Sequence, residues 1–232
     1  MSKRTLVMLV GAALLFSAPA FAVDGQVLIN QSTVMAAGGF PYKITQPGSY
    51  KLSGNLVVSA PSTDGIVMET GNVTLDLNGF TISGPVTCTG YGSGLSCSGT
   101  GGIGIYAPAP GNAPVNQTIR NGSVVGFQYG VQVDSNGLVE EIHATGNSNS
   151  GIYAIDSLLR RNIISYNVFG IQEYRSTVTE NVASWNLASG LVVTGGVYGG
   201  NTFEGNGDTS VRPGFLGGGV SQNNNDCNGT VC

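Results

Sequence analysis

Residues 162–167 read Asn-Ile-Ile-Ser-Tyr-Asn, and residues 181–186 read Asn-Val-Ala-Ser-Trp-Asn. The same pattern continues on both sides of this pair, with equivalent positions 19 or 20 residues apart. Two apolar columns carry it, Ile119, Val139, Leu159, Val178 and Tyr198, and then Val124, Ala144, Ile164, Ala183 and Phe203. A fixed period of this length is typical of a solenoid, because a unit of about 20 residues cannot bury its apolar face alone.

Glycines give the same period independently. Gly130, Gly151, Gly170 and Gly190 each precede a short segment in which apolar residues alternate. Alternation with period two is the pattern of a half-buried strand. The chain is therefore predicted to be all-β, with about six to eight stacked parallel coils between an N-terminal and a C-terminal cap.

The predicted organisation follows from where this period begins and fades. Residues 1–22 are expected to be a signal peptide, 23–48 an N-terminal cap, 49–207 the coils, and 208–232 a C-terminal cap or tail. A segment near residues 85–103, rich in Gly, Ser and Thr, interrupts the period. We expect this insertion to project from the coils as a loop.

The first residues have the pattern of an export signal. Lys3 and Arg4 precede an apolar run over residues 6–16, and Ala20-Phe21-Ala22 offers small residues where a signal peptidase reads. The run is shorter than the roughly 20 apolar residues of a membrane span, and no later stretch approaches that length. We expect cleavage after Ala22 and a secreted or periplasmic protein without a membrane span; an N-terminal anchor is the alternative.

Composition excludes one class of partner. The chain has 9 basic and 13 acidic residues, and the predicted signal peptide carries two of the basic ones. A negative chain without a basic patch is not expected to bind nucleic acid. Charged residues make up 9% of the chain against roughly 25% in an average domain, and the 37 glycines fall at turns between short apolar segments.

Four cysteines in an exported chain indicate disulfides, with three possible pairings. Cys88 and Cys97 bracket the insertion, and Cys227 and Cys232 lie at the end of the chain, so pairing of neighbours is the economical choice. Zinc binding is the alternative, but neither pair has the short spacing of a zinc knuckle. We expect two disulfides and no metal site.

These repeats carry a resemblance to a known group of proteins. The Gly-Ile-Tyr-Ala strands at 104–107 and 151–154, with the runs at 162–167 and 181–186, resemble the repeats of the pectate-lyase-like superfamily. The resemblance covers about residues 45–207 and implies a right-handed, single-stranded parallel β-helix. It says little about activity, because that superfamily includes polysaccharide lyases, glycosidases, epimerases, carbohydrate-binding modules and inert scaffolds.

Two further features fit that resemblance. Residues 44–50 and 73–79 are similar to segments of uncharacterised exported bacterial β-helix proteins. Asn162, Asn181 and Asn201 form an inward column that resembles the superfamily's asparagine ladder, in which each side-chain amide bonds the backbone of the next coil. The resemblance implies a structural role for this column.

One outward column suggests binding. Tyr106, Gln132, Tyr153 and Gln172 lie at equal positions in successive coils. Tyrosine rings offer flat faces to sugars, and glutamine amides offer donors and acceptors. This column is the candidate carbohydrate-binding strip. The aromatic pair Tyr166 and Trp185, at equal positions in adjacent coils, extends it or simply forms stacked packing.

Convergent catalytic groups are scarce. The Asn-Thr-Asp, Asp-Asp, Gly-His-Gly and Arg-Ile-Lys motifs of polygalacturonase-like glycosidases are absent. A lyase of this fold needs a Lys or Arg base, usually assisted by a cation. Asp134, Asp156 and Arg175 fall at similar turns of successive coils and form the best such constellation. Asp before Ser is also an ordinary turn pattern, which is the simpler interpretation.

Two single residues are further candidates for functional groups. Glu173 stands in an otherwise apolar inward column, so we expect a bend that brings Tyr174 into the core; a buried carboxylate is the alternative. His143, the single histidine, is expected to face solvent.

Charged residues also form columns, Arg120, Glu140 and Arg160 beside Asn121, Glu141, Arg161 and Glu180. Opposite charges face each other from coil to coil, which favours ion pairing over binding of a uronate or of calcium.

The expected function is a structural or carbohydrate-binding module without its own catalytic site and without a cofactor. Its partners would be a polysaccharide or envelope components. The alternative is a lyase that cleaves acidic polysaccharide by β-elimination, with an arginine base and calcium. The sequence leaves the ligand, the biological process and the oligomeric state open.

Overall fold

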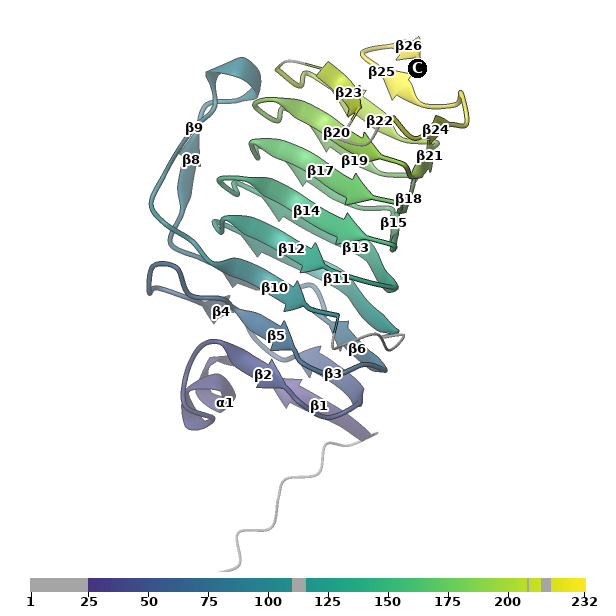
Figure 1. The fold of residues 1–232 in the computed structure, drawn as a ribbon. Helices are drawn as coiled ribbons and strands as arrows, with labels where there is room; N and C mark the ends of the chain where they lie inside the picture. The colour runs from purple at the N-terminus through teal and green to yellow at the C-terminus, as the bar shows by residue number, and fades with distance from the viewer. Residues whose placement is uncertain (1–24, 110–115, 208, 214–217) are drawn as a thin grey trace, which may run out of the picture.

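The computed structural model describes residues 25–109, 116–207, 209–213 and 218–232. The predicted signal peptide, residues 1–22, lies outside the described residues. The described chain winds into a parallel β-solenoid of about nine turns (Figure 1). The prediction of an all-β parallel coil is confirmed, but the predicted number of coils is too low.

One face of the solenoid is a parallel sheet of eight strands, called face 1 here. Its strands in spatial order are β2 (Tyr42–Ile44), β5 (Ile66–Met68), β10 (Ile103–Ala107), β12 (Tyr129–Val133), β14 (Ser150–Ile155), β17 (Phe169–Tyr174), β20 (Ser189–Thr194) and β23 (Thr209–Pro213).

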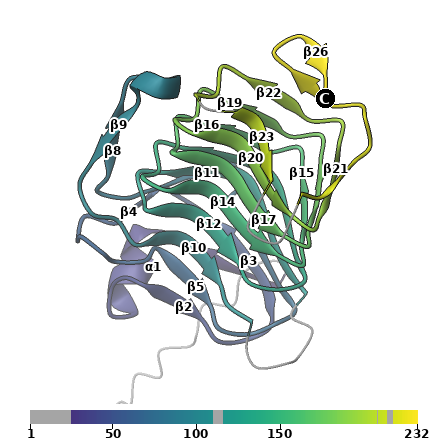
Figure 2. The same cartoon turned by 45° about the horizontal axis from the view of Figure 1, so that its top comes forward.

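The remaining strands of the coils belong to a sheet of sixteen strands, which covers the other sides of the solenoid. They are β1 (Gln26–Ile29), β3 (Gly48–Leu52), β4 (Leu56–Val57), β6 (Val73–Asp76), β7 (Thr81–Ser83), β11 (Gln117–Val125), β13 (Gly137–Thr145), β15 (Leu158–Arg160), β16 (Ile163–Ser165), β18 (Thr177–Thr179), β19 (Val182–Ser184), β21 (Val197–Gly199), β22 (Thr202–Glu204), β24 (Val220–Ser221), β25 (Asp226–Cys227) and β26 (Thr230–Val231). Figure 2 shows the coils wrapping around a common interior.

Extra coils come from the segments expected to be caps. Strand β1 pairs in parallel with β3, and β25 pairs in parallel with β22. These terminal coils are longer than the central ones, so the 19–20-residue period does not reveal them. The N-terminal end also carries the short helix α1 (Gln31–Ala36), which begins with a capping box at Asn30 and buries Val34.

The apolar columns of the sequence form a continuous core along the interior. Ile119, Val139, Leu159 and Val178 are fully buried and occupy equal registers in adjacent strands. Leu, Ile and Val of one coil therefore stack on those of the next, which is how each short repeat buries its apolar face.

The coils turn at three corners, each marked by residues in the left-handed backbone region. The first corner is Asn136, Asp156, Arg175 and Gly195, the second Asn121, Glu141, Arg161, Glu180 and Gly200, and the third Gly126, Gly146, Tyr166, Trp185 and Gly205. All have φ between 46° and 77°. Non-glycine residues are strained in this region, so the surrounding structure must hold them there.

Buried asparagines provide that support at the second corner. The side-chain carbonyl oxygen of Asn181 accepts the backbone N–H of Asn162 at 3.0 Å, and that of Asn201 accepts the N–H of Asn181 at 2.9 Å. Their side-chain amides donate to backbone carbonyls, for example that of Leu159 at 3.0 Å. Asn162, Asn181 and Asn201 thus satisfy the backbone of the tight turn from coil to coil.

A second ladder of the same kind supports the third corner. Asn147, Asn167, Asn186 and Asn206 follow one another there, and the Asn147 N–H donates to the side-chain oxygen of Asn167 at 2.9 Å.

The insertion extends along the coils toward the C-terminal end of the solenoid (Figure 1). Strands β8 (Thr87–Thr89) and β9 (Ser96–Ser98) form an antiparallel hairpin with the 3₁₀ turn η2 (Gly92–Gly94) at its tip. Its two strands are joined by the disulfide Cys88–Cys97, called the hairpin disulfide here, and Cys227–Cys232 closes the C-terminal hairpin. The predicted pairing of neighbouring cysteines is confirmed.

The tip of the hairpin packs against the third corner, several coils away from the coil at which the insertion leaves the solenoid (Figure 1). The ring of Tyr91 meets that of Trp185 edge-on at a centroid distance of 5.5 Å, and the Gly92 N–H donates to the Trp185 carbonyl at 3.0 Å. The expected projecting loop is therefore an arm packed on later coils.

Candidate functional site

The outward column on face 1 forms a continuous strip. Tyr106, Gln132, Tyr153 and Gln172 occupy one register across β10, β12, β14 and β17, and all four side chains are half-buried. The same register continues to Val67 on one side and to Val192 on the other. The tyrosine–glutamine strip is thus four coils long and has an aliphatic residue at each end.

A hollow of about 490 Å³ opens over the middle of this strip. It is lined by Tyr129, Gln132, Asp134, Tyr153 and Ile155. The rings of Tyr129 and Tyr153 meet edge-on at a centroid distance of 6.0 Å. An open hollow with aromatic walls and a few polar groups is the usual form of a small-ligand site.

Asp134 accepts hydrogen bonds from two residues of the strip. Its carboxylate accepts the Tyr106 hydroxyl at 2.9 Å on one oxygen and the Gln132 side-chain amide at 3.0 Å on the other. Burial, followed by this hydrogen bond and the nearby negative charge of Asp134, raises the pKa of Tyr106 to about 12. The phenol therefore stays protonated at any physiological pH and acts as a donor.

The three residues considered as a lyase constellation do not converge. Arg175 donates to both oxygens of Asp156, at 2.8 and 2.6 Å, and its guanidinium stacks 4.4 Å from the centre of the Tyr174 ring. The hydrogen bond from Arg175 holds the pKa of Asp156 below its ordinary value. At the first corner the residue that corresponds to Asp156 is Asn136, whose N–H donates to the Asp156 carbonyl. Asp134 therefore lies before the corner and faces the strip.

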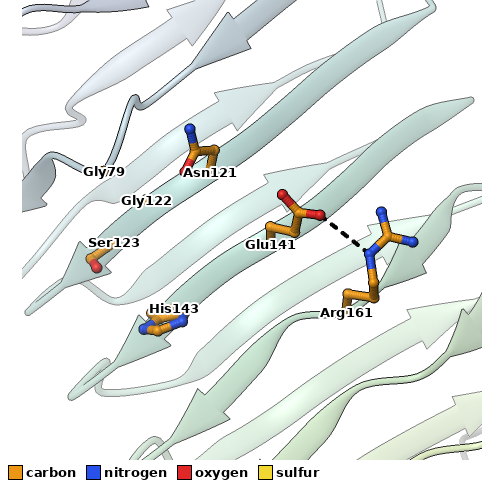
Figure 3. A pocket seen from close by; sticks show the side chains of 7 residues that line it. All are labelled: Gly79, Asn121, Gly122, Ser123, Glu141, His143 and Arg161. Carbon is orange, nitrogen blue, oxygen red and sulfur yellow. Dashed lines mark hydrogen bonds and ion pairs between the residues drawn. The ribbon is translucent and has the colours of Figure 1, made fainter.

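A second hollow, of about 340 Å³, lies across the second corner (Figure 3). Ser123 and His143 are register partners on β11 and β13 and line it together with Asn121. Glu141 and Arg161 face each other at its rim, 3.2 Å apart. His143 is exposed, and sequence reasoning did not identify this hollow because corner curvature leaves no signal in the repeat.

The charged columns form ion pairs between coils. Arg160 lies 2.8 Å from Glu140, Arg161 lies 2.9 Å from the same carboxylate, and Arg120 lies 3.3 Å from Asp76. These contacts engage the guanidinium groups of Arg160 and Arg161, while Arg120 contacts Asp76 through one terminal nitrogen. The arginine side chains of these pairs are partly exposed, whereas the Glu140 carboxylate is buried.

Glu173 is buried, so the expected bend is wrong. Strand β17 continues regularly, and Glu173 points into the core with an exposed fraction of 3%. Its carboxylate accepts the backbone N–H groups of Ser176 and Thr194, both at 2.7 Å. Burial raises the pKa of Glu173, and these N–H groups with that of Gly196 partly counter the shift.

This carboxylate completes a short serine ladder. At the first corner, Ser157 Oγ accepts the Gly137 N–H at 3.0 Å, and Ser176 Oγ accepts the Ser157 N–H at 3.1 Å. The next rung is Gly196, where a Cβ would lie 2.3 Å from the Ser176 carbonyl oxygen, so no serine fits. Glu173 supplies the missing acceptor, which gives it a structural role.

Within the described ranges there is no cluster of three or more His, Cys, Asp or Glu residues that could hold a metal. Those ranges also contain no helix long and apolar enough to cross a membrane. No family model, no curated protein and no solved structure matches the chain.

Proposed function

We propose that this protein is a carbohydrate-binding module that holds a neutral glycan on face 1. The observation that carries the proposal is the convergence of Gln132, Asp134 and Tyr153 at one open hollow, with the Tyr106 hydroxyl bonded to the Asp134 carboxylate. Half-buried tyrosine rings offer apolar faces for pyranose C–H groups, while an amide and a carboxylate bond sugar hydroxyls. Two predictions from the sequence accompany this proposal, namely membership of the pectate-lyase-like superfamily and export from the cell.

Charge favours a neutral ligand over an acidic one. Asp134 is the single charged residue among those that line the hollow. Arg175, at the first corner, already donates two hydrogen bonds to Asp156. A uronate carboxylate would therefore meet a like charge without a cation to hold it, which costs binding free energy.

The lyase alternative needs a different arrangement. An arginine base must approach the carbon next to a uronate carboxylate, with calcium or another cation to neutralise that carboxylate. Here Arg175 would first have to leave Asp156. The alternative is tested by incubating the protein with polygalacturonate and calcium and following the absorbance of the unsaturated product.

The proposal is tested by affinity electrophoresis in gels that contain neutral glucan, mannan or xylan, or acidic polygalacturonate or alginate. We expect a neutral polysaccharide to retard the protein, and Tyr153→Ala to weaken binding at least about fivefold, which corresponds to about 1 kcal/mol of stacking. Tyr166→Ala is the matched control, because it makes the same change at an exposed tyrosine that lies at the third corner and outside the strip.

Two results would contradict the proposal. Retardation by the acidic polymers alone would mean that Asp134 does not select the ligand. Equal migration in every gel would contradict carbohydrate binding and favour the structural module, which is the other function that the sequence predicts.

A further inference from the structure

The binding strip alternates between two chemistries. From β10 to β17 the order is Tyr106, Gln132, Tyr153, Gln172, so aromatic and amide side chains alternate with a period of two coils. The valines that follow in the same register at either end offer neither a ring nor a hydrogen bond. The strip is therefore a finite, periodic surface with defined ends.

The side-chain amide of each glutamine forms one hydrogen bond to a neighbouring protein side chain. Gln132 donates its amide nitrogen to Asp134 at 3.0 Å, and Gln172 accepts the Ser150 hydroxyl on its carbonyl oxygen. These two bonds use the amide nitrogen of Gln132 and the carbonyl of Gln172, so the opposite end of each amide is the one that would bond a ligand. These contacts fix each glutamine in one orientation, which limits the entropy lost on binding.

The spacing of the coils matches an extended sugar chain. Neighbouring parallel strands lie about 4.8 Å apart. This is close to the length of one pyranose unit in a β-1,4-linked chain, in which successive units are turned over by about half a turn. Every second unit then presents the same edge, as every second coil presents the same side chain.

We propose that the glycan lies along the solenoid axis with one sugar unit per coil, and that the site holds four units of a β-1,4-linked neutral chain. Tyr106 and Tyr153 stack on alternate units, and Gln132 and Gln172 bond the hydroxyls of the units between them. Asp134 lies beside the first two units. This inference rests on the proposed function, since it specifies which residues of the same strip contact each sugar unit of the ligand.

The test is isothermal titration calorimetry with β-1,4-linked glucose and mannose oligosaccharides of one to six units. In at least one series, affinity should rise at least threefold with each added unit up to four and then stay constant. α-1,4-linked glucose oligosaccharides are the control, because they have the same sugar but a curved chain that does not repeat every second unit. They should bind at least tenfold more weakly than the β-linked chain of four.

A gain-of-function variant tests the register independently of any loss of folding. Val192 is the next position in the strip after Gln172, and the alternation places a tyrosine there. Val192→Tyr should move the plateau from four units to five, whereas Val192→Ala should leave it at four.

The outcomes separate the two proposals. A plateau at one or two units, or an equal affinity for the α-linked chain, would overturn the axial register while glycan binding stands. Retention on a neutral polysaccharide without binding of either β-linked series would also overturn it. Absence of binding to every saccharide and polysaccharide would overturn this inference together with the proposed function.

Discussion

Replacing Glu173 by valine tests whether its buried carboxylate is a structural acceptor. Valine suits this apolar column, since Val133 and Val193 occupy equivalent positions. By apolar burial alone, Glu173→Val should stabilise the protein. By the hydrogen-bond argument it should do the opposite, because the N–H groups of Ser176 and Thr194 lose their acceptor.

The magnitude follows from these two bonds. A buried N–H left without a partner costs about 1–3 kcal/mol, so two such groups cost about 2–6 kcal/mol. Removing the buried carboxylate also removes its own desolvation penalty, which offsets part of this cost and places the net effect toward the lower end of the range. We therefore expect Glu173→Val to lower the free energy of unfolding by about 2–3 kcal/mol.

Urea denaturation followed by far-UV circular dichroism measures the effect. Glu204→Val is the control, because it makes the same change at an exposed strand position and should alter stability by less than about 0.5 kcal/mol. A Glu173→Val protein as stable as the wild type, or more stable, would refute the acceptor role.

The same carboxylate gives a pH dependence with a defined sign. Its pKa in the folded protein is raised above the ordinary value of 4.5. The folded state therefore binds the proton more tightly, so this group's contribution to stability is fully present below pH 4.5 and is lost as pH rises through the folded pKa. The stability of the wild type relative to Glu173→Val should fall over that interval; a rise would contradict the shift.

Three further predictions concern other parts of the structure. Asn181→Ala removes a rung that both accepts and donates, so unfolding free energy should fall by at least about 2 kcal/mol in urea titrations; an unchanged midpoint would contradict the ladder. Arg175→Ala breaks an exposed pair and should cost less than about 1 kcal/mol, while NMR titration should show the pKa of Asp156 rising toward its ordinary value. Replacing both cysteines of the hairpin disulfide by serine should loosen the arm and shift the emission of the single tryptophan, Trp185, to longer wavelength with unchanged circular dichroism; an unshifted spectrum would mean that the arm holds its place without the crosslink.

The repeat explains why much of the fold could be predicted. Apolar columns, the Asn162 column and the order of the tyrosine–glutamine strip all follow from counting one period, because parallel coils place equal positions side by side. The terminal coils are longer than this period, so counting the period does not detect them. The number of coils was therefore underestimated, although their parallel pairing follows the same geometry.

The candidate site needed information that a period does not contain. One additional residue in the coil after β12 puts Asn136, and not Asp134, at the first corner, so Asp134 turns to Tyr106. Glu173 is explained by the close approach of the backbone at Gly196, which alternation of apolar residues cannot reveal. Both features arise from contacts between coils that differ from their neighbours.

The most direct test of the central claim is to map the glycan contact by NMR. ¹H–¹⁵N spectra of the protein would be recorded during titration with the β-1,4-linked glucose and mannose chains of four units. The account predicts, for at least one chain, shifts confined to the outward residues of β10, β12, β14 and β17 and to Asp134. Shifts centred on His143 in the second hollow, or on Trp185 at the third corner, would contradict it.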